Sequence, residues 1–248
     1  MKPTHFLGCA LAVVAIAGCN SKSGDAAGSA PAKLEQVAPP KGGDWTQVVS
    51  PTPQGGFVMG NPNAPVKLVE YGSMTCHFCA EFDDAAAKPL TENYVKSGQV
   101  SWEFRNYVRD PLDLTASLIA RCNGAKGFFP LTGALYKDQA NWTAKIQTTP
   151  EAQLQQLQNL PPNRQFTELA NMAGFQQWAA LRGVPTAKSN QCLADQNAVN
   201  QLVQMTSDVM NEHPQFPGTP SFVINGELAE KTASWKDLEP ALRKALGR

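Results

Sequence analysis

Two cysteines separated by two residues, Cys76 and Cys79, constrain the fold more than any other feature of this 248-residue chain. A strand is predicted over residues 66–71, a run rich in β-branched residues that follows the turn-forming segment Asn-Pro-Asn-Ala-Pro. Helix-forming residues follow the cysteines and continue toward Ser97, with a kink expected around Pro89. The C-x-x-C motif therefore lies at a strand-to-helix junction, where the helix begins.

This position predicts redox chemistry for the pair. At a helix N-terminus, free backbone N–H groups and the positive end of the helix dipole stabilise an anion. They lower the pKa of a thiol from about 8.5 to between roughly 3.5 and 7.5. We expect Cys76 to be an exposed, nucleophilic thiolate and Cys79, one turn further along, to be a buried thiol that resolves mixed disulfides.

Two other interpretations of the pair fit its spacing less well. A structural zinc site needs four ligands, usually as two close pairs, whereas Cys122 and Cys192 stand singly and far apart. Beyond the first residues, only His77 and His213 remain as further nitrogen ligands. A purely structural disulfide is also a poor fit, because closing so short a loop restricts the unfolded chain very little. The sequence therefore predicts no metal site.

The C-terminal part of the chain predicts a hairpin and a closing helix. Residues 216–226, Phe-Pro-Gly-Thr-Pro-Ser-Phe-Val-Ile-Asn-Gly, indicate a turn, a strand and then an Asn-Gly hairpin turn. Residues 227–230 are expected to form the return strand. An amphipathic helix is expected from Ser234, with leucines at i, i+4 spacing at Leu238, Leu242 and Leu246.

Together these motifs resemble the thioredoxin superfamily and, within it, the DsbA family of exported thiol–disulfide oxidoreductases. The resemblance covers roughly residues 56–247 and rests on the C-x-x-C after a strand and on Thr219-Pro220 before Phe-Val-Ile-Asn-Gly. It implies that Pro220 is cis and faces Cys76, and that backbone groups of Thr219 pair with a substrate chain. The alternative is a Pro220 that is not cis and merely opens a strand.

The resemblance also suggests roles for two residues near the cysteines. Glu70 stands six residues before Cys76, where the family has an acid beneath the active site that assists proton movement at the buried thiol. Alternatively, its side chain points to solvent. The best-known DsbA members have Pro-His between the cysteines, and that histidine stabilises the reduced thiolate. This chain has His77-Phe78 instead, so His77 either tunes the thiolate from a shifted position or is an exposed spectator.

The middle of the chain is almost wholly helical in character. From this resemblance we interpret residues 109–213 as an inserted all-helical domain. The α/β thioredoxin fold that contains the insertion is expected to comprise residues 57–108 and 214–248. One long helix is expected over residues 189–211. Its apolar stripes, like the others in this region, are interpreted as core and not as a cofactor site.

Cys122 and Cys192 both lie inside this insertion, each in an expected helix. Some DsbA relatives carry a second, non-catalytic disulfide, so the resemblance implies a structural disulfide between these two cysteines. In the chain-entropy treatment such a bridge is worth roughly 4 kcal/mol. Two buried free thiols are the alternative.

The first residues indicate export. A positively charged start and a 13-residue apolar stretch match a signal peptide, predicted over residues 1–18, and the stretch is too short to span a bilayer. It ends in Ile-Ala-Gly-Cys, which resembles the lipobox of bacterial lipoproteins and implies diacylglyceryl attachment to Cys19. A plain secretory signal is the alternative. Residues 19–56 are interpreted as an acylated N-terminus and flexible linker, with a short edge strand at residues 45–49.

The sequence therefore predicts a lipid-anchored, monomeric enzyme of the cell envelope, on the periplasmic side of a bacterial membrane. Lys+Arg and Asp+Glu both total 21, so the net charge is zero and nothing favours nucleic acid binding. The resemblance implies that the Cys76–Cys79 pair oxidises unfolded or reduced exported proteins and is reoxidised by a quinone-linked membrane oxidase. No motif requires a metal, nucleotide or haem cofactor. The alternatives are a reductase or isomerase of the same fold, or a non-enzymatic metal-binding or scaffold lipoprotein.

Overall fold

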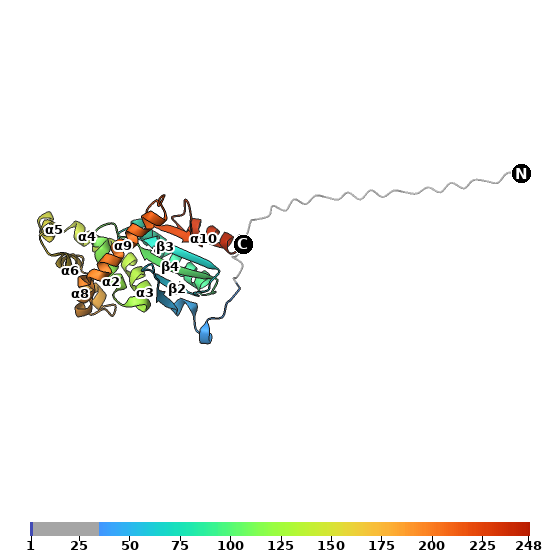
Figure 1. Cartoon of the computed structure of the whole chain (residues 1–248), viewed down its shortest axis with the longest axis horizontal. Coiled ribbons are helices and arrows are strands. Elements are labelled where there is room, and N and C mark those ends of the chain that lie inside the picture. Colours follow the sequence, from blue (N-terminus) through green and yellow to red (C-terminus); the bar gives the residue numbers. More distant parts are fainter. Residues whose placement is uncertain (2–34) are drawn as a thin grey trace. The chain divides into compact units, whose positions relative to one another are not determined.

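A mixed β-sheet is the centre of the chain in this computed structural model, which describes Met1 and residues 35–248 (Figure 1). Within these residues the strands are ordered β1-β2-β4-β3-β5-β6. β3 and β4 are parallel in the middle of the sheet, and the other neighbouring strands pair antiparallel. The strands span Val49–Pro51 (β1), Phe57–Gly60 (β2), Val66–Gly72 (β3), Val100–Asn106 (β4), Ser221–Ile224 (β5) and Glu227–Leu228 (β6).

Strand β3 leads directly to the cysteine motif. Burial alternates over residues 66–70, whereas Glu70, Tyr71 and Gly72 at the end of the strand are all buried. Glu70 lies opposite Phe104 of β4 and Phe222 of β5. A short connection then leads into helix α1 (His77–Pro89). The ring of Phe82 in α1 packs on Phe222 with 4.6 Å between centroids, so α1 covers the face of the sheet that carries Glu70.

Helix α1 changes character at Pro89, where the sequence predicts a kink. Proline has no N–H to continue the α-helical ladder, and the chain goes on as the π-helical segment η3 (Leu90–Val95). Tyr94 of η3 donates a hydrogen bond to Glu239 of the C-terminal helix α10 (Trp235–Ala245) at 2.8 Å. This contact holds α10 beside α1, against the same face of the sheet.

The predicted C-terminal hairpin forms β5 and β6. Asn225 and Gly226 make the turn with φ angles of 52° and 90°, a left-handed conformation that these two residue types adopt most readily. The return strand ends at Leu228, earlier than the predicted residue 230, and a turn follows at Glu230 and Lys231.

Between β4 and β5 the described chain forms only helices. Figure 1 shows α2, α3 and α9 near the sheet, with α4, α5, α6 and α8 gathered beyond them. The apolar side chains of the sheet and of these helices form one continuous core. The helices span Pro111–Arg121 (α2), Gly124–Lys137 (α3), Gln139–Gln147 (α4), Glu151–Leu157 (α5), Pro162–Ala173 (α6), Phe175–Ala180 (α7), Thr186–Ala194 (α8) and Gln196–Glu212 (α9).

The single helix predicted over residues 189–211 was wrong, because the chain breaks there into α8 and α9. Asp195 has extended backbone angles and caps α9. Its Oδ1 accepts hydrogen bonds from the backbone N–H groups of Asn197 at 2.9 Å and Ala198 at 3.2 Å. An aspartate in this position satisfies helix N–H groups that otherwise have no partner.

Residues 45–56, predicted to belong to the flexible linker, are part of the fold. Trp45 is only 6% exposed, and its indole N–H donates to the carbonyl of Val37 at 2.8 Å. Residues 45–47 form a 3₁₀ turn, and the edge strand begins at Val49. The linker boundary at residue 56 was therefore wrong, because burying the indole offsets the entropy cost of ordering this segment. The predicted edge strand forms, but it begins where the predicted range of 45–49 ends.

These elements form an α/β thioredoxin fold with a helical insertion between β4 and β5, as the sequence predicts. The predicted signal peptide beyond Met1, and Cys19 with it, lie outside the described residues. Among the helices that the structure describes, none has the length and apolar character needed to cross a membrane.

Candidate active site

The two cysteines of the motif lie at the start of α1 as free thiols. Cys76 is the residue before the helix and Cys79 is in its first turn. The thiol of Cys76 donates to the carbonyl oxygen of Thr219 at 3.1 Å, and the side-chain amide of Gln139 donates to the carbonyl of Cys76 at 2.9 Å. Cys76 is only 4% exposed, so the prediction of an exposed thiolate was wrong; segments remote in sequence cover it. Cys79 is fully buried.

The surroundings drive the pKa values of the two thiols apart. A hydrogen bond from the Cys79 side chain, contact with Thr219, the backbone N–H of Cys79 and the charge of Arg109 together lower the pKa of Cys76 to about 5, against the opposing effect of burial. Burial, and then the neighbouring Cys76 sulfur, raise the pKa of Cys79 well above its ordinary value. At neutral pH the pair therefore consists of one thiolate and one thiol.

The loop before β5 lies against Cys76. The Thr219–Pro220 peptide bond is cis, and Pro220 is buried. Ser221 donates from its hydroxyl to the carbonyl of Gly218 at 2.5 Å, which ties the two ends of the loop together. The hydroxyl of Thr219 is buried and has no hydrogen-bond partner among the described residues. The structure thus brings together the cysteine motif and Thr219-Pro220, which are distant in sequence.

Glu70 points into the protein and not to solvent. It is 1% exposed, and the indole N–H of Trp102 donates to its Oε2 at 3.0 Å. Burial, followed by the negative charge of Asp83, raises the pKa of Glu70 to about 8. Glu70 in turn contributes to the raised pKa of Cys79, so this carboxyl group is close enough to interact with the buried thiol.

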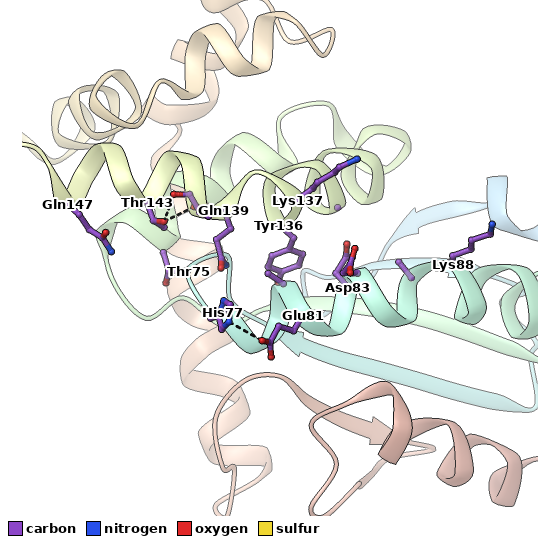
Figure 2. Close-up of a pocket in the computed structure, with 15 residues that line it drawn as sticks. Thr75, His77, Glu81, Asp83, Lys88, Tyr136, Lys137, Gln139, Thr143 and Gln147 are labelled. Atoms are coloured by element: carbon purple, nitrogen blue, oxygen red, sulfur yellow. Dashed lines mark hydrogen bonds and ion pairs between the residues drawn. The ribbon is translucent and has the colours of Figure 1, made fainter.

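His77 is turned away from the cysteine sulfurs. Its Nε2 lies 3.0 Å from Oε1 of Glu81, one turn further along α1, and its side chain is 76% exposed. Figure 2 shows the two side chains meeting on the outer side of the helix, at the edge of a groove of about 830 Å³ between α1 and the α3–α4 segment. The geometry therefore favours the spectator interpretation of His77.

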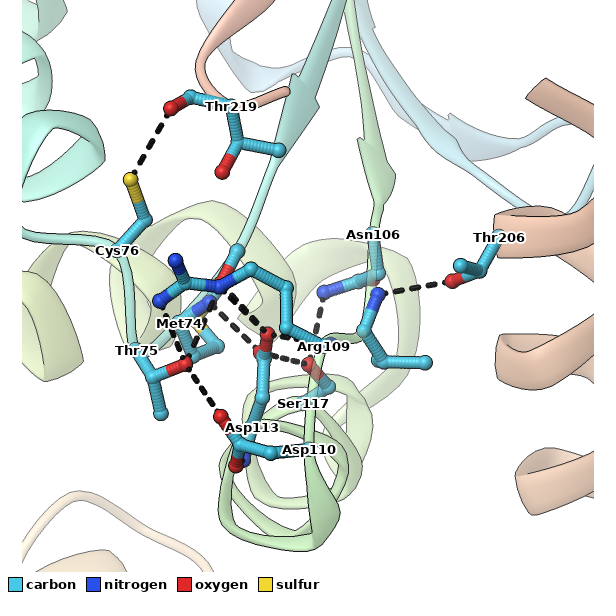
Figure 3. Close-up of polar contacts among 12 residues, drawn as sticks. Met74, Thr75, Cys76, Asn106, Arg109, Asp110, Asp113, Ser117, Thr206 and Thr219 are labelled. Carbon is cyan, nitrogen blue, oxygen red and sulfur yellow. Dashed lines mark hydrogen bonds and ion pairs between the residues drawn. The ribbon is translucent and has the colours of Figure 1, made fainter. Parts of the chain in front are cut away.

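A polar network beneath Cys76 was missed by the sequence analysis (Figure 3). Asp113 of α2 is fully buried and accepts hydrogen bonds from the hydroxyl of Ser73 at 2.5 Å and from the backbone N–H of Met74 at 2.8 Å. Arg109, for which the sequence indicated no role, contacts the same loop. The only signal was Asp110-Pro111-Leu-Asp113, which reads as an ordinary helix start.

The other two cysteines are joined to each other. Cys122 at the C-terminal end of α2 and Cys192 in α8 form a disulfide with 5.7 Å between their Cα atoms. His213, considered from the sequence only as a possible nitrogen ligand, lies edge-on to the ring of Tyr71, with 6.2 Å between ring centroids. Within the described part of the chain, no group of three or more His, Cys, Asp or Glu side chains is arranged to hold a metal ion.

Comparisons with known proteins agree with this geometry. A family model described as thioredoxin matches residues 52–244. A Rickettsia bellii protein provisionally named a protein-disulfide oxidoreductase is 27% identical over 191 residues, covering 77% of this chain and 64% of the relative. A Rickettsia felis protein with the same provisional name is 28% identical over 191 residues, covering 77% and 60%. The chain thus spans somewhat less than two thirds of the length of these relatives.

Solved structures give the same result. The protein-disulfide isomerase of Novosphingobium aromaticivorans is 32% identical, with a TM-score of 0.73, and the match covers 77% of this chain and 97% of that one. Wolbachia pipientis α-DsbA1 has the same fold at 22% identity, with a TM-score of 0.63 and coverage of 79% and 93%. The chain therefore belongs to the thioredoxin family, and it shares its fold with Wolbachia α-DsbA1.

Proposed function

We propose that this protein is an exported thiol–disulfide oxidoreductase that introduces disulfide bonds into unfolded or reduced exported proteins. Cys76 is the sulfur that the substrate attacks and that later leaves as a thiolate, and Cys79 is the buried sulfur that leaves in the first step. The proposal is supported by the buried pair at the helix start, by the adjoining cis-proline loop and by the names of its relatives.

The reaction begins with the pair oxidised. A substrate thiolate attacks the sulfur of Cys76, the Cys76–Cys79 bond breaks, and the sulfur of Cys79 takes the electron pair and a proton. A second substrate thiolate then attacks the substrate sulfur of the mixed disulfide, and Cys76 leaves as a thiolate. Two electrons have passed from the substrate dithiol to the protein. Glu70, with a pKa of about 8, is protonated at neutral pH and is the nearby donor for the proton on Cys79.

The observation that carries the oxidase direction is the lowered pKa of Cys76. A thiol with a pKa of about 5 is a thiolate at pH 7, which stabilises the reduced pair by about 3 kcal/mol relative to a protonated one. Since about 30 mV corresponds to 1.4 kcal/mol for a two-electron couple, this raises the reduction potential by roughly 60 mV. A protein whose reduced form is stabilised in this way is an oxidant of other thiols.

The substrate chain is proposed to bind along the loop that ends in Thr219. An extended polypeptide there places its cysteine next to Cys76, because the carbonyl of Thr219 is already within 3.1 Å of that sulfur. Backbone pairing of this kind recognises no particular side chain, which suits an enzyme that acts on many unfolded proteins.

We also propose that the chain is held at a bacterial membrane. The apolar stretch ending at residue 18 and the lipobox-like Ile-Ala-Gly-Cys19 support export and a lipid anchor on the periplasmic side. A quinone-linked oxidase in that membrane is the proposed acceptor of the two electrons. Labelling with a radioactive fatty acid, compared between the wild-type chain and C19S, tests the anchor. Equal labelling of the two chains contradicts it.

The reduction potential of the Cys76–Cys79 pair tests the direction of the reaction. The protein is equilibrated with glutathione buffers, and the fraction of free thiol is measured by trapping. A potential clearly above −270 mV, toward the −120 mV of strong oxidants, is the expected result, and one near −270 mV identifies a reductase. The oxidised protein is also expected to oxidise a reduced, unfolded test protein in stoichiometric amounts.

A second candidate is an isomerase, because the Novosphingobium protein at 32% identity is titled a protein-disulfide isomerase. An isomerase attacks wrongly paired disulfides while its own pair is reduced. Recovery of activity from ribonuclease A with scrambled disulfides measures this directly. Faster recovery with the reduced protein than with the oxidised one supports isomerase activity over oxidase activity.

A scaffold or metal-binding lipoprotein is distinguished by trapping. In a C79S variant the mixed disulfide on Cys76 cannot be resolved, so an enzyme accumulates covalent adducts with its substrates. The C76S/C79S double variant is the matched control and traps nothing. If C79S also traps nothing from exported proteins, the enzymatic proposal fails.

A further inference from the structure

Arg109 is fixed beside the loop that carries the reactive cysteine. Its side chain reaches back from the segment between β4 and α2 to the residues that precede Cys76. Its Nε donates to the hydroxyl of Ser73 at 2.8 Å, and its Nη2 donates to the hydroxyl of Thr75 at 2.9 Å. Two hydrogen bonds from one planar guanidinium group set both the position and the orientation of its charge.

Asp113 connects this arginine to the cysteine loop from below. Besides its bonds to Ser73 and Met74, its Oδ2 accepts from the backbone N–H of Arg109 at 3.1 Å and lies 3.9 Å from Nε of the same residue. A fully buried carboxylate is costly unless it is paired and hydrogen-bonded, and the bonds from the loop and from Arg109 meet that requirement. Asp113 therefore holds both Arg109 and the loop that precedes Cys76.

The guanidinium group retains an unused edge near Cys76. Among the described residues, Nη1 of Arg109 has no hydrogen-bond partner, and the side chain is 40% exposed. Figure 3 shows the guanidinium group between Asp113 and the start of α1, on the side of Cys76. Its positive charge lowers the pKa of Cys76, by less than the contacts with Cys79 and Thr219 do, and it is the one full charge among these causes.

His77 does not fill this position. Its Nε2 contacts Glu81 on the outer side of α1, and the other residue between the two cysteines, Phe78, carries no charge. We propose that Arg109, anchored by Asp113, is the charge that stabilises the Cys76 thiolate in this protein. This inference rests on the proposed function and names the residues that adjust its redox potential.

Other charged or titratable groups also face Cys76, and they do not change the sign of the effect. Glu70 below the pair is neutral under about pH 8. The negative charges closest to the loop are partly compensated, because Asp110 accepts from the hydroxyl of Thr75 at 3.1 Å and Asp113 is paired with Arg109. Tyr136 of α3 donates to the carbonyl of Ser73 at 3.3 Å and stays neutral because burial raises its pKa well above its ordinary value. Other neighbours are Cys79 and His77 on α1 and the uncharged Gln139 and Thr219.

Measuring the pKa of Cys76 in full-length variants tests the proposal. The rate of alkylation by iodoacetamide, or thiolate absorbance at 240 nm, is followed against pH. In R109Q the midpoint is expected to rise by about one unit, as for loss of a nearby opposite charge. R109K keeps the charge and is expected to retain most of the lowering. R164Q removes an exposed arginine of α6 and is the matched control, with no shift expected. Equal midpoints in R109Q and R164Q overturn the proposal.

A D113N variant tests the anchor by the sign of its effect. Removing a negative charge alone lowers the pKa of a nearby thiol, whereas releasing Arg109 from its anchor raises it. We expect D113N to raise the midpoint for Cys76 in the wild-type background and to lower it in the R109Q background. A lowered or unchanged midpoint in both backgrounds shows that Asp113 does not act through Arg109. If R109Q does not fold cooperatively, R109M tests the same charge.

The redox equilibrium separates this inference from the proposed function. In R109Q the equilibrium constant with glutathione is expected to shift about tenfold toward the oxidised pair, which corresponds to about 30 mV. A wild-type potential near that of a reductase contradicts the oxidase proposal while leaving the pKa test of Arg109 valid. An oxidising wild-type potential that R109Q does not change contradicts the role of Arg109 alone.

Discussion

The two cysteine pairs of this protein could each form a disulfide, but their surroundings differ. Cys76 and Cys79 are close in sequence, at the start of α1, and are free thiols. Cys122 and Cys192 are separated by 70 residues and form a disulfide between α2 and α8. Both pairs are largely enclosed by the fold, so burial alone does not decide which pair exchanges electrons.

The difference lies in how each environment treats its two sulfurs. Around Cys76 there are hydrogen-bond donors and the charge of Arg109, while Cys79 is enclosed, so a proton leaves one sulfur much more easily than the other. The sulfurs of the second pair are bonded to each other and do not titrate. A reactive pair requires asymmetry between its two sulfurs, and the surroundings of Cys76 and Cys79 provide it.

Deleting each pair in turn gives the largest expected contrast. C76A is expected to reduce the rate of oxidation of an unfolded dithiol protein to the uncatalysed background, because no leaving group remains. C122A/C192A is expected to keep its rate within a factor of a few. The measurement is regain of activity by reduced ribonuclease A, with the oxidised protein as the only oxidant.

The control for that experiment is the fold of each variant, followed by circular dichroism. If C122A/C192A is folded and as inactive as C76A, the second pair takes part in electron transfer. The division between a reactive pair and a structural pair is then wrong.

The second pair is expected to contribute stability instead. Closing a separation of 70 residues restricts the unfolded chain by about 4 kcal/mol in the chain-entropy treatment. C122A/C192A is therefore expected to lose about that much free energy of unfolding in urea. The comparison is the free energy of unfolding with the Cys76–Cys79 bond reduced and with it formed. That bond closes a much shorter loop, so a smaller difference is expected. A loss below about 1 kcal/mol contradicts the prediction.

The sequence predicted the first pair better than its surroundings. The strand-to-helix junction, the hairpin at Asn225-Gly226 and the capped helix at Ser234 all depend on residues close together in the chain, so local patterns predict them. The meeting of Cys76 with Thr219 followed from resemblance to a family. No local sequence pattern indicates that the sulfur of Cys76 lies 3.1 Å from the carbonyl oxygen of Thr219.

The residues that sequence analysis missed act through distant contacts. Asp113 has the pattern of a surface acid in the first turn of a helix, and only the tertiary structure buries it under the cysteine loop. Gln139 reaches the carbonyls of Met74 and Cys76 from the insertion. Trp45 orders a segment whose composition is typical of a linker. In each case tertiary packing overrides local composition.

Glu70 sharpens the comparison because, like Cys79, it is a titratable group whose pKa burial raises. Its pKa of about 8 in the folded protein exceeds the ordinary value of 4.5, so the folded state holds a proton that the unfolded chain releases. The free energy of unfolding therefore falls as the pH rises through this window, by about 3 kcal/mol between pH 4.5 and pH 7. E70Q is expected to recover most of this loss at pH 7 and little at pH 5.

Urea unfolding of the oxidised protein at the two pH values measures the effect. Asp83 and Asp113, whose pKa values burial raises to about 6, add a pH dependence of the same sign that E70Q does not remove. E227Q changes an exposed glutamate of β6 and is the matched control, with a change within about 0.5 kcal/mol expected. If E70Q destabilises the protein equally at both pH values, the carboxyl group is ionised in the folded state.

His77 is expected to give the smallest effect, although it lies between the two reactive cysteines. Its side chain is 76% exposed and bonds to Glu81, whose own side chain is 58% exposed. Exposed ion pairs contribute at most about 1 kcal/mol and are weakened by salt. H77Q is therefore expected to move the pKa of Cys76 by less than about 0.5 unit. If the pKa of Cys76 rises in H77Q as much as it is expected to rise in R109Q, the histidine ring turns from Glu81 toward the sulfur. His77 then stabilises the thiolate at least as much as Arg109 does. Repeating the titration with E81Q removes the partner of His77 and leaves the ring in place. A changed pKa of Cys76 in E81Q means that Glu81 holds the histidine away from the sulfur, and an unchanged pKa means that the histidine does not reach it.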